Sequence, residues 1–190
     1  MDTSDKEAPE VLSSEDVYRG RVFTVSVDRV RERGREYARE VVRHAGSGVV
    51  LPVHDDATVS LVRQYRHPAV KYLLEAPAGS REPFESPEEC ARRELEEELG
   101  LVAGRLELLA EFFVSPGFCA EKMWLYLATD LTETKSNPED DELLEVVRLP
   151  LRRALEMIST NEIEDAKTII GLMLAAKAVN RESRLGGFGS

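Results

Sequence analysis

The stretch SPEECARRELEEELGL, which begins at Ser86, carries both ends of a helix in its sequence. Ser86 is suited to the N-cap, Pro87 fits the first helical position, and Glu89 completes a capping box. Gly100 is suited to the left-handed position that follows a helix. The sequence therefore predicts a helix over residues 87–99, which the rest of the fold has to accommodate.

This helix has one apolar stripe and an acidic edge beside it. Helical periodicity stacks three apolar residues along one face: Ala91, Leu95 and Leu99. Three carboxylates share the edge next to that stripe: Glu94, Glu97 and Glu98. Glu96 points away from the stripe, towards solvent. Because the apolar stripe should face the core, the three carboxylates are predicted to be half-buried.

The like charge on this edge is unfavourable, since glutamates three or four positions apart repel by roughly 0.2–0.5 kcal/mol per pair. A cation among the carboxylates would relieve the repulsion, and oxygen-only ligands favour hard cations such as Mg²⁺ or Mn²⁺. Mg²⁺ commonly takes one or two carboxylates and fills its other positions with water and substrate phosphate. Charge pattern alone leaves an alternative, a solvated acidic face supported by Arg92 and Arg93.

The chain of 190 residues has a formal net charge of −11. A general nucleic-acid binder needs a basic surface for the phosphate backbone, so this charge argues against that class. An acidic protein can still bind an anionic nucleotide where metal ions or local arginines offset the repulsion. The charge therefore favours a small-molecule substrate over nucleic acid.

Cys90 and Cys119 provide neither a disulfide framework nor zinc-ligand spacing, and we expect reduced thiols of a cytosolic compartment. The N-terminal residues lack the basic start and apolar stretch of a signal peptide. No segment approaches the roughly 20 apolar residues of a transmembrane helix. The sequence therefore predicts a cytoplasmic protein with no membrane association.

Four regions are expected along the chain: a disordered tail over 1–16, an N-terminal β-element over 17–44, a main domain over 45–182 and a flexible tail over 183–190. The β-element reads as two strands that meet in a hairpin, and such a pair must dock on the main domain or on another subunit to bury its apolar face. In the main domain, GVVLPV and ATVSLVRQYR are expected to pair as strands that turn at HDDA. Strands before and after the acidic helix, with helices closing the chain, predict an α/β fold with a mixed sheet packed between helices.

A longer pattern contains the acidic helix: Gly79-x5-Glu85-x7-Arg93-Glu94-Leu95-x-Glu97-Glu98-x-Gly100-Leu101. It resembles the signature of the Nudix hydrolases at every defined position. LEAPAG before the pattern, with SPGF and EIEDAKTI after it, is similar to the ADP-ribose pyrophosphatase branch of that family. Pro116, fifteen residues beyond the pattern, stands where this branch marks its substrate class.

The resemblance implies an α/β/α sandwich that binds Mg²⁺, or Mn²⁺ in its place, and hydrolyses nucleoside diphosphates linked to another group. For this branch the implied substrate is ADP-ribose and the products are AMP and ribose 5-phosphate. It also implies a homodimer in which the N-terminal β-element exchanges between subunits. The alternatives are the same chemistry on another nucleoside diphosphate sugar such as GDP-mannose, or a non-catalytic nucleotide-sensing regulator.

Roles for individual residues follow from the same resemblance. The implied metal ligands are the backbone carbonyl of Ala78 and three side chains: Glu94, Glu97 and Glu98. Glu97 would also assist catalysis. Glu85 would pair with Arg93 and orient the helix, while Gly79 would let the loop turn tightly beside the metal.

The general base of this branch often lies in an acidic loop late in the chain, which here reads NPEDDELLEV. Glu142 and Glu139 are the candidates, with Glu142 favoured because it is nearer the following strand. The resemblance also implies four substrate contacts: Arg66, Pro116, Gly117 and Phe118. Arg63 and Arg66 are three apart and should point to opposite faces of a strand, so at most one of them is expected at the pocket.

Overall fold

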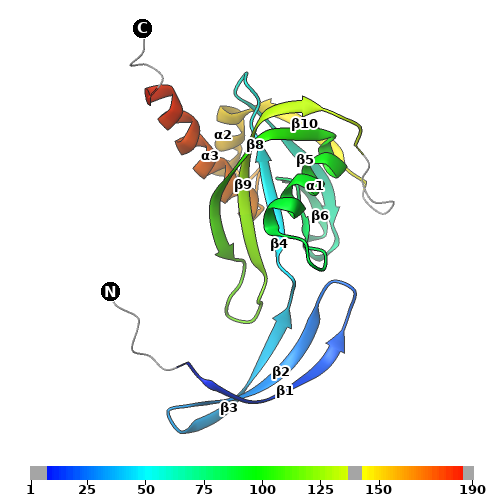
Figure 1. Cartoon of the computed structure of the whole chain (residues 1–190), viewed down its shortest axis with the longest axis vertical. Helices are drawn as coiled ribbons and strands as arrows, with labels where there is room; N and C mark the ends of the chain where they lie inside the picture. The colour runs from blue at the N-terminus through cyan, green and yellow to red at the C-terminus, as the bar shows by residue number, and fades with distance from the viewer. Residues whose placement is uncertain (1–7, 137–142, 186–190) are drawn as a thin grey trace. The chain divides into compact units, whose positions relative to one another are not determined.

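The computed structural model describes residues 8–136 and 143–185, with side chains described as far as residue 179. The chain divides into two compact units (Figure 1). The first comprises Met1–Gly46 together with Phe113–Lys122, and the second comprises Ser47–Phe112 with Met123–Ser190. Within the described ranges, no helix is both long enough and apolar enough to cross a membrane.

The N-terminal unit contains an antiparallel sheet of three strands in the order β1-β2-β3: β1 (Glu10–Arg19), β2 (Thr24–Glu32) and β3 (Arg35–Arg43). The expectation of a disordered tail up to residue 16 is wrong from Glu10 onwards. Most of β1 is exposed, so it has no alternating apolar pattern that would signal a strand. Polar contacts hold it instead, since Ser14 donates to Asp28 at 2.6 Å and Ser26 donates to Asp16 at 2.8 Å.

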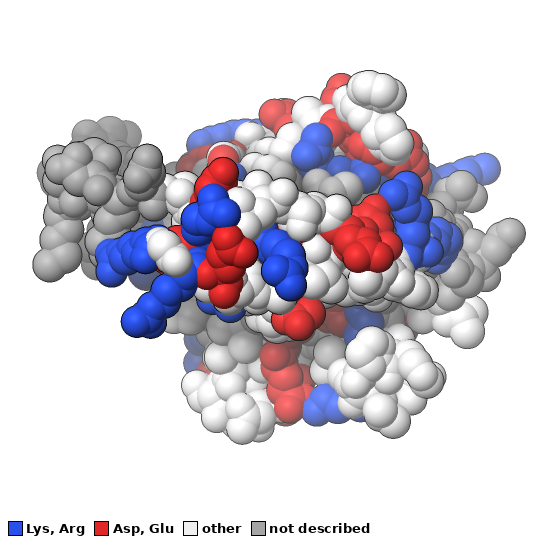
Figure 2. Space-filling view, turned by 90° about the horizontal axis from the view of Figure 1, so that it is seen from below, with Lys and Arg blue, Asp and Glu red and all other residues white. Residues whose placement is uncertain are grey.

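A later segment, residues 113–122, also belongs to this unit because its backbone pairs with β3. Val42 donates its backbone N–H to the carbonyl of Phe118 at 2.8 Å and accepts from Ala120 at 2.9 Å. Opposite charges of the unit are paired locally, as in the ion pair of Arg43 with Asp28 at 2.5 Å. Figure 2 shows basic and acidic side chains lying next to one another on the surface seen from below.

The second unit contains two sheets and three α-helices among its described residues. One sheet has the order β7-β4-β9-β8, from β4 (Ser47–Pro52), β7 (Ala78–Ser80), β8 (Leu101–Phe113) and β9 (Lys122–Glu133). The other has the order β10-β5-β6, from β5 (Thr58–Arg66), β6 (Lys71–Glu75) and β10 (Glu145–Pro150). The helices are η1 (His67–Ala69), α1 (Pro87–Leu99), α2 (Leu151–Ser159) and α3 (Ala166–Leu185). β4 runs parallel to β9 and antiparallel to β7, so the first sheet is mixed.

β4 and β5 turn at residues 54–57 as expected, but they do not form a strand pair. A single bridge joins Val53 to Val59, after which β4 and β5 enter different sheets. The local sequence indicates the turn, whereas the choice of partners depends on strands much later in the chain. β4 pairs with β9 and β5 pairs with β10.

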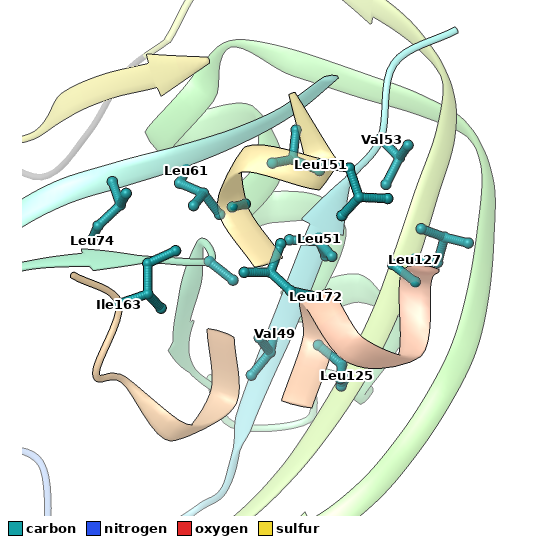
Figure 3. Close-up of a cluster of buried hydrophobic side chains, with 14 residues drawn as sticks. Val49, Leu51, Val53, Leu61, Leu74, Leu125, Leu127, Leu151, Ile163 and Leu172 are labelled. Carbon is teal, nitrogen blue, oxygen red and sulfur yellow. The ribbon is translucent and has the colours of Figure 1, made fainter. Parts of the chain in front are cut away.

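Alternate side chains of β4 pack on two sides of the sheet. Val49 and Leu51 belong to a buried cluster that includes Leu172 of α3 (Figure 3). Val50, between them, belongs to a second cluster that includes Ala91 and Leu95 of α1. Consequently α1 lies on one side of the sheet, while α2 and α3 lie on the other (Figure 1). This arrangement confirms the predicted α/β fold with a mixed sheet between helices.

Candidate functional site

The acidic helix α1 begins and ends at the predicted residues. Ser86 Oγ accepts a hydrogen bond from Glu89 N at 3.2 Å, and Glu89 Oε2 accepts one from Ser86 N at 2.8 Å. These bonds complete the capping box and satisfy N–H groups that the helix itself cannot pair. Gly100 follows the helix with φ of 61°, in the left-handed region that favours glycine.

The carboxylates of α1 have three different environments. Glu94 and Glu98 are buried, with 6% and 3% of the residue exposed. Glu97 is half-buried and Glu96 is exposed. Glu94 and Glu98 are therefore more deeply buried than predicted, and their charges need compensation within the fold or from a ligand.

Arg93 provides part of this compensation. Its Nη1 donates to Glu94 Oε1 at 2.7 Å and to Glu97 Oε2 at 2.9 Å. Its Nε donates to Glu85 Oε1 at 2.8 Å, and this hydrogen bond is the main cause that lowers the pKa of Glu85. In turn, the hydrogen bond with Glu85 is the main cause that raises the pKa of Arg93. The ion pair expected between Glu85 and Arg93 is thus formed, and one guanidinium connects the loop before α1 with two of its carboxylates.

Gly79 is required by lack of space rather than by a tight turn. Gly79 does not have a positive φ, so the tight turn expected from the sequence is not the reason for a glycine here. A β-carbon at Gly79 would lie 1.8 Å from Oε1 of Glu94. The opposite residue on β4 is Gly48, where a β-carbon would lie 2.7 Å from the backbone nitrogen of Ala91. The two paired glycines therefore allow α1 and its buried carboxylate to approach the sheet closely.

The backbone of Ala78, the implied carbonyl ligand, is held by the sheet next to Glu94. Ala78 pairs with Val49, and the preceding carbonyl of Pro77 accepts from Val50 N at 3.0 Å. On the other side, Ala76 N donates to Thr168 Oγ1 at 2.7 Å. The short segment leading into Gly79 is thus fixed by β4 and by α3.

Arg63 and Arg66 point to different faces, as the strand spacing predicts. Arg63 lies 3.7 Å from Glu145 on the neighbouring β10. Arg66 makes two hydrogen bonds of 2.8 Å to Glu75. The pKa of Arg66 is raised, chiefly by the hydrogen bond to Glu75 and to a smaller extent by the charge of Glu98. Of the two, Arg66 is therefore the arginine whose charge acts on the acidic edge of α1.

The remaining predicted site residues belong to the other unit or lie outside the described residues. Pro116, Gly117 and Phe118 lie in the N-terminal unit, where Phe118 is 58% exposed. Glu139 and Glu142, the two candidates for the general base, lie outside the described residues.

The donor set fits a hard divalent cation. Two buried carboxylates, Glu94 and Glu98, share one side of α1, and the backbone of Ala78 adjoins Gly79, which lies against Glu94. Mg²⁺ takes one or two carboxylates and completes its octahedron with water and substrate phosphate, so it needs no cage made of protein alone. Among the described residues, no three His, Cys, Asp or Glu side chains form such a cage. An oxygen-only set of this kind suits Mg²⁺ or Mn²⁺ and not zinc.

Sequence reasoning missed three residues beside the predicted site residues: Gly48 pairs with Gly79, Glu75 bonds to Arg66, and Lys167 pairs with Glu75. Glu75 is 1% exposed and Lys167 is 7% exposed, and the two form a buried ion pair of 2.5 Å. Glu75 occurs in LEAPAG and Lys167 in EIEDAKTI, two segments that indicated only a family resemblance. In YLLEAPAG, a charged residue directly follows the apolar end of a strand, and this pattern could have indicated a special role for Glu75.

Comparison with known proteins agrees with this geometry. The NUDIX domain family matches residues 42–170. The chain is 38% identical over 160 residues to the ADP-ribose pyrophosphatase of Bacillus subtilis (strain 168), covering 83% of this chain and 86% of that relative. It is 37% identical over 147 residues to the GDP-mannose pyrophosphatase of Yersinia pestis (strain Pestoides F), covering 72% of this chain and 74% of that relative. A crystal structure of an ADP compounds hydrolase matches with a TM-score of 0.82 at 28% identity, covering 96% of this chain and 100% of the other. The chain therefore belongs to the Nudix family of hydrolases.

Proposed function

We propose that the protein hydrolyses the diphosphate of ADP-ribose with the help of Mg²⁺, or of Mn²⁺ in its place. Water adds across the P–O–P bridge, so that one phosphorus leaves on AMP and the other on ribose 5-phosphate. The observation that carries this proposal is the pair of buried carboxylates, Glu94 and Glu98, on one side of α1. The names of two relatives, ADP-ribose pyrophosphatase and ADP compounds hydrolase, support the choice of substrate.

The chain's own residues would hold the reactants in place. Glu94, Glu98 and the Ala78 carbonyl would bind the metal, with Glu97 assisting from its half-buried position. When bound, a divalent cation neutralises charge on the diphosphate and favours deprotonation of water. Arg93 keeps the carboxylates of Glu94 and Glu97 together through its two hydrogen bonds. These interactions set the positions of the carboxylates before substrate arrives.

Arg66 would donate hydrogen bonds to oxygens of the diphosphate. Its side chain is 40% exposed, and its guanidinium is paired with the carboxylate of Glu75. A planar guanidinium suits phosphate oxygens, since it presents paired N–H groups at fixed spacing. Glu142, or Glu139, would accept the proton of the attacking water. Glu142→Ala and Glu139→Ala separate the two, because the general base should lose orders of magnitude in kcat with substrate affinity retained.

The N-terminal unit would supply the rest of the substrate site within a homodimer. Pro116, Gly117 and Phe118 would contact the substrate there, and the exposed aromatic rings of this unit, including Phe23 at 41% exposed, support such a role. Size-exclusion chromatography with light scattering tests the dimer, and a stable monomer would contradict it. We place the protein in the cytoplasm, supported by its two free cysteines, Cys90 and Cys119.

A second candidate substrate is another nucleoside diphosphate sugar such as GDP-mannose, which the Yersinia pestis relative favours. The same carboxylates would serve either substrate, because they handle the diphosphate and not the base. A non-catalytic nucleotide sensor is less well supported, because the acidic residues of the helix are all present.

One assay tests the proposal and its alternatives. The protein is incubated with Mg²⁺ and either ADP-ribose, GDP-mannose, NADH or a diadenosine polyphosphate, and the products are separated by chromatography. We expect AMP and ribose 5-phosphate from ADP-ribose, and loss of the reaction with EDTA. Glu94→Gln and Glu98→Gln should each lower kcat/KM by about 100-fold or more, whereas Glu96→Gln, at an exposed position of the same helix, should retain it. Cleavage of none of the compounds would overturn the hydrolase proposal.

A further inference from the structure

A buried ion pair joins the first turn of α3 to the end of β6. Lys167 Nζ lies 2.5 Å from Glu75 Oε2 and 3.1 Å from Asp165 Oδ1. The side chains of Lys167 and Glu75 are 7% and 1% exposed. A buried ion pair adds little stability over a well-packed apolar pair of similar size, because both charges lose their hydration. Stability alone therefore does not explain this pair, and Glu75 also bonds to a third group.

Arg66 is that third group. Glu75 Oε1 accepts from Arg66 Nε and Glu75 Oε2 accepts from Arg66 Nη2, each at 2.8 Å. Burial would raise the pKa of Glu75, but the hydrogen bond from Arg66 and the charge of Lys167 outweigh it and the pKa is lowered. Glu75 is thus a fully charged carboxylate shared by two cations.

The hydrogen bonds to Glu75 use only one edge of the Arg66 guanidinium. Nη1 makes no hydrogen bond to any residue that the structure describes, and 40% of the Arg66 side chain is exposed. A guanidinium has five N–H groups in a fixed plane, so fixing one edge also fixes the direction of the other. The strand β5, which ends at Arg66, packs against α1, and the charge of Glu98 on α1 contributes to raising the pKa of Arg66 after its interactions with Glu75.

We propose that Lys167 is a positioning residue, which holds the Glu75 carboxylate so that Arg66 presents its open edge to the diphosphate of the substrate. This inference rests on the proposed function, since it takes a nucleoside diphosphate as the ligand. Lys167 anchors Glu75 Oε2 from the side of α3, where Asp165 also contacts it. Without Lys167, the carboxylate is free to rotate towards Arg66 alone, and both the direction and the available charge of the guanidinium change.

Lys167→Met tests the proposal, with Lys71→Met as its matched control. Lys71 is an exposed lysine on β6 whose ion pair with Glu164 lies near the same end of α3. We expect Lys167→Met to raise KM for ADP-ribose, and Kd for an uncleavable methylene analogue of ADP-ribose, by about tenfold, the usual effect of losing a charged hydrogen bond. The value of kcat should change by less than about threefold, because the chemical groups on α1 remain in place. Lys71→Met should leave both constants unchanged, and Lys167→Arg should restore most of the affinity.

A double-mutant cycle separates positioning from a general structural effect. If Lys167 acts through Arg66, Arg66→Gln combined with Lys167→Met should bind the analogue as Arg66→Gln alone does. Effects that multiply instead would show that Lys167 acts independently and would overturn the proposal. An unchanged Kd in folded Lys167→Met, checked by circular dichroism, would overturn it as well.

Should Lys167→Met fail to fold, Glu75→Gln tests the same connection to Arg66, and Asp165 still pairs with the buried Lys167 in that variant. Loss of analogue affinity by about tenfold supports the proposal, and affinity equal to that of the wild type overturns it. Turnover of ADP-ribose by the wild-type protein decides the proposed function, whereas the ratio of variant to wild-type Kd decides the role of Lys167. The proposed function and the role of Lys167 can therefore fail separately, and a wild-type protein that binds no diphosphate overturns both.

Discussion

The space at Gly79 is filled by the carboxylate of Glu94. A β-carbon at Gly79 would lie 1.8 Å from Oε1 of Glu94 and 2.2 Å from its Cδ. Real contacts of a β-carbon are far longer, so any other residue at position 79 has to displace either β7 or the Glu94 side chain. The glycine of the signature is thus coupled directly to a proposed metal ligand.

Gly79→Ala should therefore impair catalysis more than folding. We expect kcat/KM to fall by about 100-fold, since misplacing a catalytic group by about an ångström has effects of this size. The free energy of unfolding, measured by urea denaturation, should fall by about 1 to 3 kcal/mol, as for other overpacked sites.

The control for this prediction is Glu94→Ala, which removes the atoms that a methyl group at position 79 would meet. In that background, Gly79→Ala should cause little further loss of stability. A further loss as large as in the wild type would mean that the contact with Glu94 is not what excludes a side chain at position 79.

Arg93 and Arg92 are adjacent arginines with different surroundings. Arg93 is 25% exposed and bonds to Glu85, while Arg92 is 42% exposed and pairs with Glu88 one turn away. Replacing Arg93 by Met leaves its carboxylate partners without their shared cation, and we expect a loss of about 2 to 4 kcal/mol in the free energy of unfolding. Replacing Arg92 by Met should cost only about 1 kcal/mol, because it removes an exposed ion pair and one hydrogen bond to the carbonyl of Ala103.

Urea denaturation of the two variants at neutral pH checks this difference, and methionine preserves helix propensity in both. Equal losses would contradict the central place given to Arg93. The Arg92 variant controls for loss of charge and of helix context, because both arginines lie on α1 and both variants lose one positive charge.

The two cysteines should differ in reactivity. Cys90 is buried, and burial raises the pKa of its thiol to about 12, whereas Cys119 is partly exposed. Because the thiolate is the reactive form, a thiol reagent such as DTNB at pH 8 should modify one thiol of the folded protein and two after denaturation. Cys119→Ser should then show no fast reaction until the protein unfolds. Two rapidly reacting thiols in the folded wild type would contradict the burial of Cys90.

The sequence was most informative where structure depends on neighbouring residues. The ends of α1 follow from Ser86 and Gly100, because caps are formed by residues within a few positions of the helix terminus. The order of burial along α1 also follows from helical periodicity, with Glu94 inside and Glu96 outside.

Contacts between distant segments could not be predicted in the same way. Glu75 and Lys167 are 92 residues apart, and nothing in either segment alone indicates that they pair. The strand β1 was missed because it is mostly exposed and therefore has no apolar alternation. Gly79 was expected to serve a tight turn, whereas its role comes from the side chain of Glu94, which approaches from a different element.

The ion pair between Glu85 and Arg93 should make stability depend on pH in a defined direction. The pKa of Glu85 is lowered from its ordinary value of 4.5, chiefly by the hydrogen bond from Arg93. A carboxyl group with a lowered pKa in the folded state stabilises the fold above about pH 4.5, and this contribution is lost as the pH falls below that value. Glu85→Gln should therefore reduce the free energy of unfolding by about 1 to 3 kcal/mol at pH 7, the range for a charged hydrogen bond.

The difference between Glu85→Gln and the wild type should shrink as the pH is lowered, because the wild-type carboxyl becomes neutral as well. Urea denaturation at pH 7, 5, 4 and 3 measures this convergence, at pH values chosen to bracket the window in which Glu85 titrates. Glu96→Gln is the control, since Glu96 is an exposed glutamate of the same helix and its removal should shift stability little at any of these values. A difference that stays constant down to pH 3 would show that Glu85 contributes through packing and not through its charge.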